Sequence, residues 1–573
     1  MGAKQSKIVA AIDFGTSYSG FAYMFSADKD EIITAKHGTF LPEDRVPTVL
    51  LLNPDETFNS FGIDAEDRYS ALVLADKHCS YRLFREFKMA LFTKNEKLKS
   101  DILIHDTEGR SKKATDVFSI VIGHLKSLVI NSIKSKVVDT SFESKIEWML
   151  TIPAVWPDSA RQFMRQAPQA GGIEEDKLRL VLEPEAAALF CKDQLLHLSH
   201  NAGLTLLKPG TKYILADLGG GTADICVHEV LKNGHIRELY RAVGGPFGGT
   251  TVNNAFVQFM IKLFGAPIWR KLQKYKCYDY IRIMREFEKK KKKFDFKNTV
   301  NFVVDIPSTL INMVESDVES DLETLLSQTD CSASVQFKDD KLICDKKIMA
   351  SFFESSINDI VSILREIFAN CPRDELKTLL VVGGYSESQY LRESITKAMR
   401  HVEVVLAQEP RLAVLKGAVK MGLEPKNIIE RKVRYTYGFC TAETFKEGEH
   451  PSFLKFEREG KTLCDRIFSK VIEKNAVVTS GQEFKVTTFE TVKESRWMNL
   501  LISLYRSTKF NPKYCLKSEE CTMVGKIKVN APSHGWPTRY SIDLIIIAQE
   551  TEFKVRVIDW TSSRKFETNI DFL

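Results

Sequence analysis

The feature that most constrains this chain is an aspartate followed by three glycines between two apolar runs. Residues 213–216 predict a buried strand that ends at Asp217, and residues 225–231 alternate as a second strand. Gly219, Gly220 and Gly221 lack the Cβ atoms that would keep an anion away from backbone N–H groups. Asp217 and Asp224 flank the turn, and a carboxylate beside a phosphate needs a cation such as Mg²⁺ between them. The stretch predicts a phosphate-binding loop, and an ordinary Gly-rich hairpin turn is the alternative.

A second loop of the same kind lies near the N-terminus. The apolar run 7–12 runs into Asp13, Gly15, Thr16, Ser17 and Tyr18, and a returning strand is expected at 20–25. Backbone donors and the two hydroxyl groups of this loop would surround an anion. Two such loops far apart in the sequence predict two similar lobes that close on one nucleotide.

A third piece has the same strand-then-glycine pattern. Residues 379–382 predict a strand, Gly383 and Gly384 follow it with Tyr385 and Ser386, and a helix is expected over 387–400. Glycines at this point would let the backbone approach a flat base or a ribose.

In this order the three pieces resemble the actin-like ATPases, most closely the 70-kDa heat-shock chaperone family and its divergent twelfth subfamily. The fold that the resemblance implies is α/β: a two-lobed actin-like ATPase with ribonuclease-H-like lobes, then a C-terminal antiparallel β-sandwich without a helical lid. The boundaries we expect are 1–425 for the nucleotide-binding domain, 426–435 for a linker and 436–573 for the β-domain. Short apolar runs support that β-domain, at 476–479, 484–488, 498–505, 525–529, 540–548 and 553–560.

The resemblance also implies roles for individual residues. Lys88, in a helix-like stretch over 84–91, would reach the γ-phosphate, while Thr222 and Asp224 would orient the attacking water. Asp13, Asp217 and Glu183 would hold a hydrated Mg²⁺, Glu183 through water. Pro153 and Arg161 match residues thought to relay the nucleotide state to the other domain. The remaining nucleotide-binding candidates are Gly248, Gly249 and Thr250, whose amides would approach the β- and γ-phosphates, and Glu286, Lys289 and Lys290 around the adenosine.

The adenosine candidates depart from the family pattern. A lysine at position 290 stacks on a base less well than the family's arginine, Lys293 stands where the family has serine, and Arg411 replaces an aspartate. A run of five lysines is otherwise typical of a solvated helix face. Residues 300–350 show little family likeness, and we expect an irregular small lobe with an acidic loop at 315–323.

Composition limits the remaining possibilities. A length of 573 residues favours two domains, and 44% hydrophobic with 27% charged residues is typical of a globular protein. A net charge of +6 is too small to indicate a nucleic-acid partner. Eleven scattered cysteines without a Cys-x-x-Cys pair argue against structural zinc and favour the reducing cytoplasm, and no apolar run approaches a membrane span of about 20 residues. Gly2 fits an N-myristoylation pattern that would give weak membrane contact. The alternative interpretation is a short polar segment that leads into the first strand.

The function that the resemblance implies is ATP binding with Mg²⁺ and slow hydrolysis to ADP and phosphate. Nucleotide state would then control the binding of an unfolded or client polypeptide, with co-chaperones as further partners, in a stress response. Two alternatives stay open: a nucleotide-binding scaffold or signalling protein with negligible hydrolysis, and a small-molecule kinase on the same fold.

Overall fold

A computed structural model describes residues 7–27, 31–34, 44–92, 101–138, 141–197, 208–318, 321–371, 375–424, 428–491, 496–549, 553–560 and 564–569. The chain divides into two compact units. Unit 1 comprises Met1–Trp156, Phe163–Gly234 and Ala242–Asn427, and unit 2 comprises Pro157–Gln162, His235–Arg241 and Ile428–Leu573. The Gly2 myristoylation pattern lies outside the described residues.

The first sheet of unit 1 is built around the N-terminal strand. Its order is β11-β10-β1-β2-β3, with β4 also paired to β2. Strand β1 pairs in parallel with β10 and antiparallel with β2, and β10 pairs in parallel with β11. Every residue of β1 is buried, as a continuous apolar run in a sheet covered on both faces requires. The strands are β1 (Ile8–Phe14), β2 (Tyr18–Phe25), β3 (Ile33–Thr34), β4 (Val46–Pro47), β10 (Ile146–Ile152) and β11 (Leu178–Leu182).

The second sheet of unit 1 repeats this topology. In the order β19-β18-β12-β13-β14, strand β12 pairs in parallel with β18 and antiparallel with β13, and β18 pairs in parallel with β19. Strands β1 and β12 therefore hold equivalent places, and a glycine loop follows each of them. The prediction of two similar lobes is confirmed by this repetition. The strands are β12 (Lys212–Leu218), β13 (Ala223–Val230), β14 (Ile236–Gly245), β18 (Leu376–Val382) and β19 (Glu403–Leu406).

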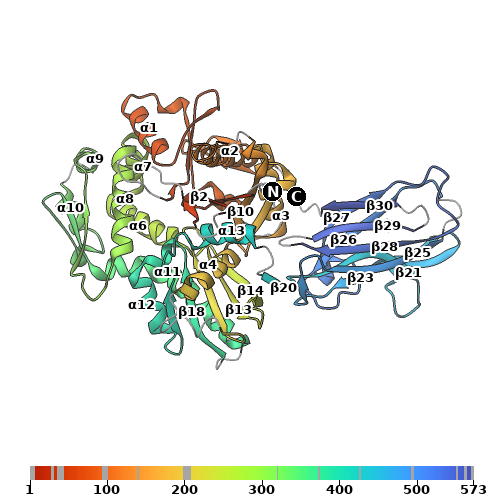
Figure 1. The fold of residues 1–573 in the computed structure, drawn as a ribbon. Helices are drawn as coiled ribbons and strands as arrows, with labels where there is room; N and C mark the ends of the chain where they lie inside the picture. The colour runs from red at the N-terminus through yellow and green to blue at the C-terminus, as the bar shows by residue number, and fades with distance from the viewer. Residues whose placement is uncertain are drawn as a thin grey trace. The chain divides into compact units, whose positions relative to one another are not determined.

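Two helices join the sheets of unit 1. Helix α13 (Ala413–Leu423) packs on β1, β2 and β10, and α4 (Glu183–His197) packs on β12 and β13. The two helices also pack against each other, and Figure 1 shows them side by side between the two sheets. A Cβ placed at Gly417 would lie 1.8 Å from the Ala186 carbonyl oxygen, so this crossing requires glycine. The helix pair fixes how the two glycine loops face each other.

Helix α2 (Ala114–Lys134) corrects one expectation from the sequence. Among the described helices it is the one long and apolar enough to cross a membrane by length and composition, whereas no such run was expected. Its buried residues, among them Val117, Val121 and Leu125, recur along one face, and it packs on β1 and β2. The core helix of a globular protein can have the same length and apolar composition, so this helix by itself does not indicate a membrane span.

Two further stretches of unit 1 differ from their predictions. The stretch predicted to be helical over 84–91 is strand β7 (Arg82–Arg85) followed by a 3-10 helix at Phe87–Leu91, because Phe84 pairs with Leu50 in the sheet β6-β5-β7. The described residues between 300 and 350 are mostly in regular elements, which corrects the expectation of an irregular lobe. They form the sheet β15-β17-β16, in which alternating apolar residues of β15 and β17 are buried, together with two helices. The elements are β15 (Asn301–Asp305), β16 (Val335–Lys338), β17 (Lys341–Asp345), α9 (Ser308–Val318) and α10 (Leu322–Ser327).

The remaining elements of unit 1 surround the two sheets (Figure 1). The strands are β5 (Val49–Leu52), β6 (Phe58–Phe61), β8 (Leu103–His105) and β9 (Ser111–Lys113). The helices are α1 (Ile63–Leu74), α6 (Gly249–Phe264), α7 (Ala266–Tyr275), α8 (Cys277–Lys293), α11 (Lys346–Asn370) and α12 (Gln389–Ala398). Helix α3 (Asp158–Ala170) begins in unit 2 and continues into unit 1.

Unit 2 is built mainly from two antiparallel sheets, β22-β23-β21-β26-β27 and β25-β28-β29-β30. Each of the six runs predicted for the C-terminal region overlaps a strand, from β24 to β29. Within the predicted linker, β20 (Ile428–Lys432) pairs with β14 and with β24. The other strands are β21 (Thr436–Thr444), β22 (Lys455–Arg458), β23 (Lys461–Ile472), β24 (Val477–Thr479), β25 (Glu483–Thr491), β26 (Leu500–Ser507), β27 (Cys521–Val529), β28 (Arg539–Ala548), β29 (Phe553–Asp559) and β30 (Arg564–Asn569).

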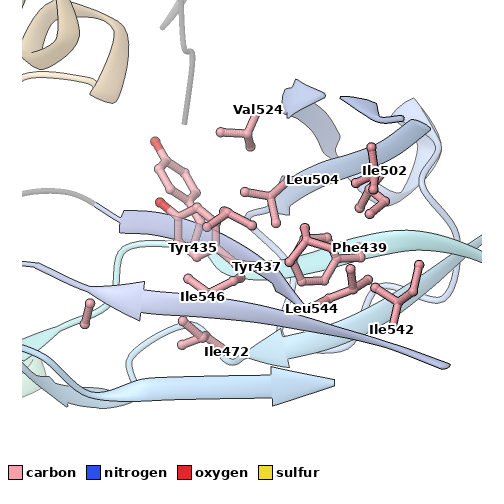
Figure 2. Close-up of a cluster of buried hydrophobic side chains, with 14 of the residues drawn as sticks. Tyr435, Tyr437, Phe439, Ile472, Ile502, Leu504, Val524, Ile542, Leu544 and Ile546 are labelled. Atoms are coloured by element: carbon pink, nitrogen blue, oxygen red, sulfur yellow. The ribbon is translucent and has the colours of Figure 1, made fainter. Parts of the chain in front are cut away.

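One cluster of buried hydrophobic side chains joins the two sheets of unit 2. Tyr437 and Phe439 of β21 and Leu504 of β26 come from the first sheet, while Ile542 and Ile546 of β28 come from the second. Figure 2 shows these side chains gathered between the strands. The shared core makes the two sheets one packed body.

Candidate functional site

The two glycine loops of unit 1 lie against each other. A Cβ placed at Gly220 would be 2.2 Å from Ser17 Oγ, and one at Gly221 would be 2.5 Å from Thr16 Oγ1. Real Cβ atoms do not approach other heavy atoms this closely, so both positions require glycine. Loops that are more than 200 residues apart in sequence therefore meet, as the repeated motif predicts.

Both loops carry backbone N–H groups without a partner. Among the described residues, the amides of residues 15–17, 220 and 221 donate no hydrogen bond, and the buried Ser17 Oγ has no partner either. Converging amide groups of this kind form a binding place for an anion. The amides of Gly248, Gly249 and Thr250 instead donate to the carbonyl oxygens of Gly221, Gly219 and Gly220, at 3.3, 3.1 and 2.8 Å. In this structure the amides of residues 248–250 therefore hold the loop of residues 219–221 in shape.

Four carboxylates are buried beside the loops: Asp13, Glu183, Asp217 and Asp224. Asp217 and Asp224 are opposite each other in the β12–β13 ladder, and Asp13 holds the equivalent place to Asp217 in β1. The backbone N–H of Val155 donates to Asp224 Oδ1 at 2.9 Å.

The mutual repulsion of these carboxylates shows in their pKa values. Burial raises the pKa of Asp217 well above its usual range, and the charges of Glu183, Asp224 and Asp13 raise it further. Burial and Glu183 raise the pKa of Asp224 to about 7, although hydrogen bonds from Val155 and Thr222 oppose that shift. Burial likewise raises the pKa of Glu183, against the attraction of Lys88. The cluster is therefore deficient in positive charge.

Lys88 supplies one positive charge to this cluster. Its Nζ lies 3.2 Å from Glu183 Oε1 and 5.0 Å from the centre of the Trp156 ring, and its side chain is almost fully buried. The preceding Glu86 has φ +51°, a conformation unusual for a residue with a side chain, and it begins the 3-10 helix that carries Lys88. The lysine predicted to contact the γ-phosphate is thus brought to the acidic cluster.

The residues present fit a hydrated divalent cation. No three His, Cys, Asp or Glu side chains among the described residues converge closely enough to bind a metal directly. Lys88 pairs with Glu183 and Arg45 with Asp13, which leaves Asp217 and Asp224 with no ion-pair partner in the described part of the chain. Two buried unpaired carboxylates complement the charge of one Mg²⁺ that keeps its water shell.

The third predicted loop contacts the second. A Cβ placed at Gly383 would lie 2.5 Å from Asp217 Oδ1, and the Gly383 N–H donates to the Pro410 carbonyl oxygen at 2.8 Å. Ser386 is buried and donates to the Gly383 carbonyl oxygen at 2.7 Å, and the Tyr385 ring is buried beside Phe353. Gly384 begins the 3-10 helix Gly384–Glu387. Gly383 is therefore brought to the acidic cluster, and residues 384–386 follow it in the 3-10 helix.

The members of the lysine run differ in burial, and the adenosine role of Glu286, Lys289 and Lys290 stays a prediction. Lys289 is exposed and pairs with the half-buried Glu286, and Lys290 Nζ donates to the Val303 carbonyl oxygen at 2.6 Å. Lys291 is buried instead, with its Nζ 2.7 Å from Glu288 Oε2 and 3.1 Å from the Gly249 carbonyl oxygen. Lys291 is thus brought to Gly249, whose N–H donates to the Gly219 carbonyl oxygen in the second glycine loop.

Two pKa shifts accompany the burial of this pair. Burial lowers the pKa of Lys291, although the Glu288 carboxylate opposes that shift. Burial alone would raise the pKa of Glu288, but the Lys291 ammonium outweighs it and the pKa is lowered.

Three further charged side chains, one of which departs from the family pattern, lie next to this pair. Lys292 Nζ is 5.9 Å from the centre of the Tyr18 ring and 3.9 Å from Glu387 Oε2. Arg411, at the position where an aspartate is expected, has its Nε 3.0 Å from Glu387 Oε1. The carboxylate of Glu387 therefore lies between two cationic side chains, Lys292 and Arg411, in this part of the site.

Four residues of the site carry no recognisable sequence signal. Thr151 Oγ1 donates to Asp13 Oδ1 at 2.9 Å, and Arg45 Nη2 lies 2.8 Å from Asp13 Oδ2. A single threonine in a strand, or a single arginine shortly before a proline, occurs in many unrelated folds. Neither residue therefore indicates a binding site from the sequence. Glu288 and Lys291 have the same three-residue spacing as Glu286 and Lys289, so spacing cannot distinguish the two pairs.

The relay candidates are placed by the structure, but their role stays a prediction. Pro153 is buried directly after β10, and its carbonyl oxygen accepts a hydrogen bond from the Trp156 N–H at 3.4 Å. Arg161 lies on α3, within the segment of that helix that belongs to unit 2.

Comparisons with known proteins agree with this geometry. The family model described as Hsp70 protein matches residues 9–419. Heat shock 70 kDa protein 12A of Mus musculus is 26% identical over 99% of this chain and 91% of its own length, and protein 12B of Homo sapiens is similar to the same extent. Chaperone protein DnaK of Elusimicrobium minutum is 30% identical over 24% of this chain and 20% of its own length.

Proposed function

Because the chain belongs to the Hsp70 family, whose nucleotide-binding domain has the two-lobed actin-like ATPase fold, we propose that unit 1 binds Mg²⁺–ATP and hydrolyses it slowly. The observation that carries this proposal is the contact between residues 16–17 and residues 220–221 beside four buried carboxylates. Facing amide groups suit a chain of phosphates, and the unpaired carboxylates suit a hydrated Mg²⁺.

Individual side chains have distinct tasks in this proposal. The backbone of both loops binds phosphate oxygens, and Asp217 holds the water shell of the metal together with Glu183. Lys88 leaves its ion pair with Glu183 to approach the γ-phosphate, where an ammonium stabilises the charge that develops on the phosphoryl group. Asp224, held by the Val155 N–H, orients the attacking water with Thr222.

We extend the proposal to unit 2 as a polypeptide-binding domain. Two antiparallel sheets with one shared core support this proposal, because they suit the β-sandwich that the resemblance implies. One relative, similar over 24% of this chain, is named a chaperone protein. The same proposal includes a client polypeptide whose binding depends on nucleotide state, and co-chaperones as partners. It also includes a role in stress response and a cytoplasmic location, with weak membrane contact if Gly2 is acylated.

Two measurements on the full chain test the nucleotide part. Titration calorimetry with ATP, ADP and GTP in the presence of Mg²⁺ should detect binding of the adenine nucleotides. Phosphate release should then fall to background in Lys88→Met, because the ammonium that stabilises the transferred group is gone. Lys262→Met is the matched control, since the Lys262 side chain is exposed and pairs with Asp330 at 3.1 Å, and neither residue belongs to the site. Absence of ATP binding by the unchanged protein would refute the proposal.

One observation favours a second candidate, a nucleotide-binding scaffold with negligible hydrolysis. Lys88 is already paired with Glu183 at 3.2 Å, so the ammonium that would stabilise the transferred phosphoryl group is bound to a carboxylate of the chain. The same experiment separates the candidates, because a scaffold binds ATP while the unchanged protein and Lys88→Met release phosphate at equal background rates.

A further inference from the structure

Arg45 is a second cation of the phosphate site, and it sits directly on the N-terminal loop. Its Nη2 lies 2.8 Å from Asp13 Oδ2 and donates to the Tyr18 carbonyl oxygen at 2.7 Å, while Nη1 donates to the Arg411 carbonyl oxygen at 3.1 Å. A Cβ placed at Gly15 would be 2.9 Å from the same Nη2. The guanidinium therefore packs on the backbone of the loop whose amides have no partner.

The segment that carries Arg45 is fixed to the loop. The next two residues form β4, which pairs with Tyr18 and Ser19 of β2. Thr48 Oγ1 donates to the Gly15 carbonyl oxygen at 2.8 Å, and the Thr48 N–H donates to the Ser17 carbonyl oxygen at 2.9 Å. The guanidinium is thus held in place by a strand and does not depend on a flexible side chain alone.

The two equivalent aspartates of the lobes are consequently unlike. Asp13 is neutralised by Arg45 and also accepts a hydrogen bond from Thr151, whereas Asp217 has no ion-pair partner among the described residues. Both carboxylates are buried, at 3% and 5% exposure, so the difference lies in their partners and not in their burial.

One guanidinium donor remains without a partner. Arg45 Nε is buried and makes no hydrogen bond to any described residue. A buried donor without an acceptor is costly and is found where a ligand supplies the acceptor. Beside a loop of free amides, an anionic oxygen is the acceptor that fits both.

We propose that Arg45 is an internal counter-cation of the nucleotide site: it neutralises Asp13 and donates to a phosphate oxygen, which leaves Asp217 as the carboxylate that serves the metal. This inference rests on the proposed function and refines it. Arg45 then lowers the dependence of nucleotide affinity on Mg²⁺, because one of the charges that repel the phosphates is compensated by the chain itself. Asp13, which the sequence predicts to hold the metal, is in this proposal the ion-pair partner of Arg45 instead.

The test compares ADP binding with Mg²⁺ and with EDTA, by titration calorimetry and by the thermal shift that ADP causes. The variants are Arg45→Met, Asp217→Asn and the double variant Arg45→Met with Asp13→Asn. Arg110→Met is a matched control, because Arg110 also binds one carboxylate, Asp106, and two carbonyl oxygens, Cys79 and Tyr81, none of which belongs to the site.

We expect the ratio of the Kd in EDTA to the Kd in Mg²⁺ to be about tenfold larger in Arg45→Met than in the unchanged protein, because the uncompensated Asp13 charge then repels the phosphates most where no Mg²⁺ offsets it; tenfold corresponds to one interaction of a charged group. Asp217→Asn should bring the ratio close to one. The double variant should bring it back toward the unchanged value, because the uncompensated Asp13 charge is removed. Arg110→Met should leave the ratio unchanged.

The possible failures are distinguishable. If the unchanged protein binds no ADP under either condition, the proposed function itself fails. If it binds ADP and Arg45→Met has the same ratio, Arg45 is not a counter-cation. If affinity falls equally in both conditions and the double variant does not recover, Arg45 merely shapes the loop, and the inference is overturned.

Discussion

The contact between the two glycine loops can be tested by adding one methyl group. In Gly220→Ala the new Cβ would lie 2.2 Å from Ser17 Oγ and 2.7 Å from Ser17 Cβ. Rotation of the serine side chain would move Oγ away but would leave Cβ in place, so the backbone of one loop must shift. Overpacking of this kind costs about 1–3 kcal/mol, and we expect the free energy of unfolding of unit 1 to fall by that amount.

A second substitution distinguishes this contact from a local effect. Ser17→Gly removes both clashing atoms, so the double variant Ser17→Gly with Gly220→Ala should recover most of the loss. The non-additivity should be about 1–3 kcal/mol, as is typical for residues in contact. Gly219→Ala is the matched control in the same loop, because its nearest neighbour would be the Thr222 carbonyl oxygen at 3.3 Å.

The assay is urea-induced unfolding of the full chain, followed by hydrogen exchange of the peptides that contain residues 213–227 and 7–25. Gly220→Ala should increase exchange in both loops, although the substitution lies in only one of them. The reasoning is refuted if Gly220→Ala is no more destabilising than Gly219→Ala, or if Ser17→Gly gives no recovery. Either result would mean that the two loops do not touch in solution.

Two further predictions concern the stability of each unit. Burial lowers the pKa of His228 in β13 to about 4 from a usual 6.5, so the unfolded chain binds a proton first as the pH falls. The contribution of His228 to the free energy of unfolding is fully present above pH 6.5 and should decrease by up to about 3 kcal/mol between pH 6.5 and 4. His228→Phe should flatten that slope in urea titrations. Trp536 is 1% exposed in the core of unit 2 and donates from Nε1 to the Met498 carbonyl oxygen, so Trp536→Ala should destabilise unit 2 by about 3–5 kcal/mol, as differential scanning calorimetry would show; an unchanged transition of unit 2 would contradict the shared core.

The local elements were largely readable from the sequence. Apolar runs that end in aspartate and glycine, such as residues 213–221, indicated the strands and loops of both lobes because strand burial and glycine conformations are local properties. The repeat of this pattern also predicted two similar lobes. Where a short run was ambiguous, as at 84–87, pairing with a distant strand overrode helical spacing.

The sequence by itself determined where the glycine loops lie and which aspartates accompany them. Only the tertiary structure decided that Arg45 neutralises Asp13, and that Lys291 rather than Lys289 is buried at the site. Ion pairs between distant segments leave no periodic trace in a sequence, and within a run of five lysines the spacing from an acid is satisfied twice. Burial, set by how α8 packs against α6 and the Gly249 carbonyl oxygen, distinguishes the two lysines.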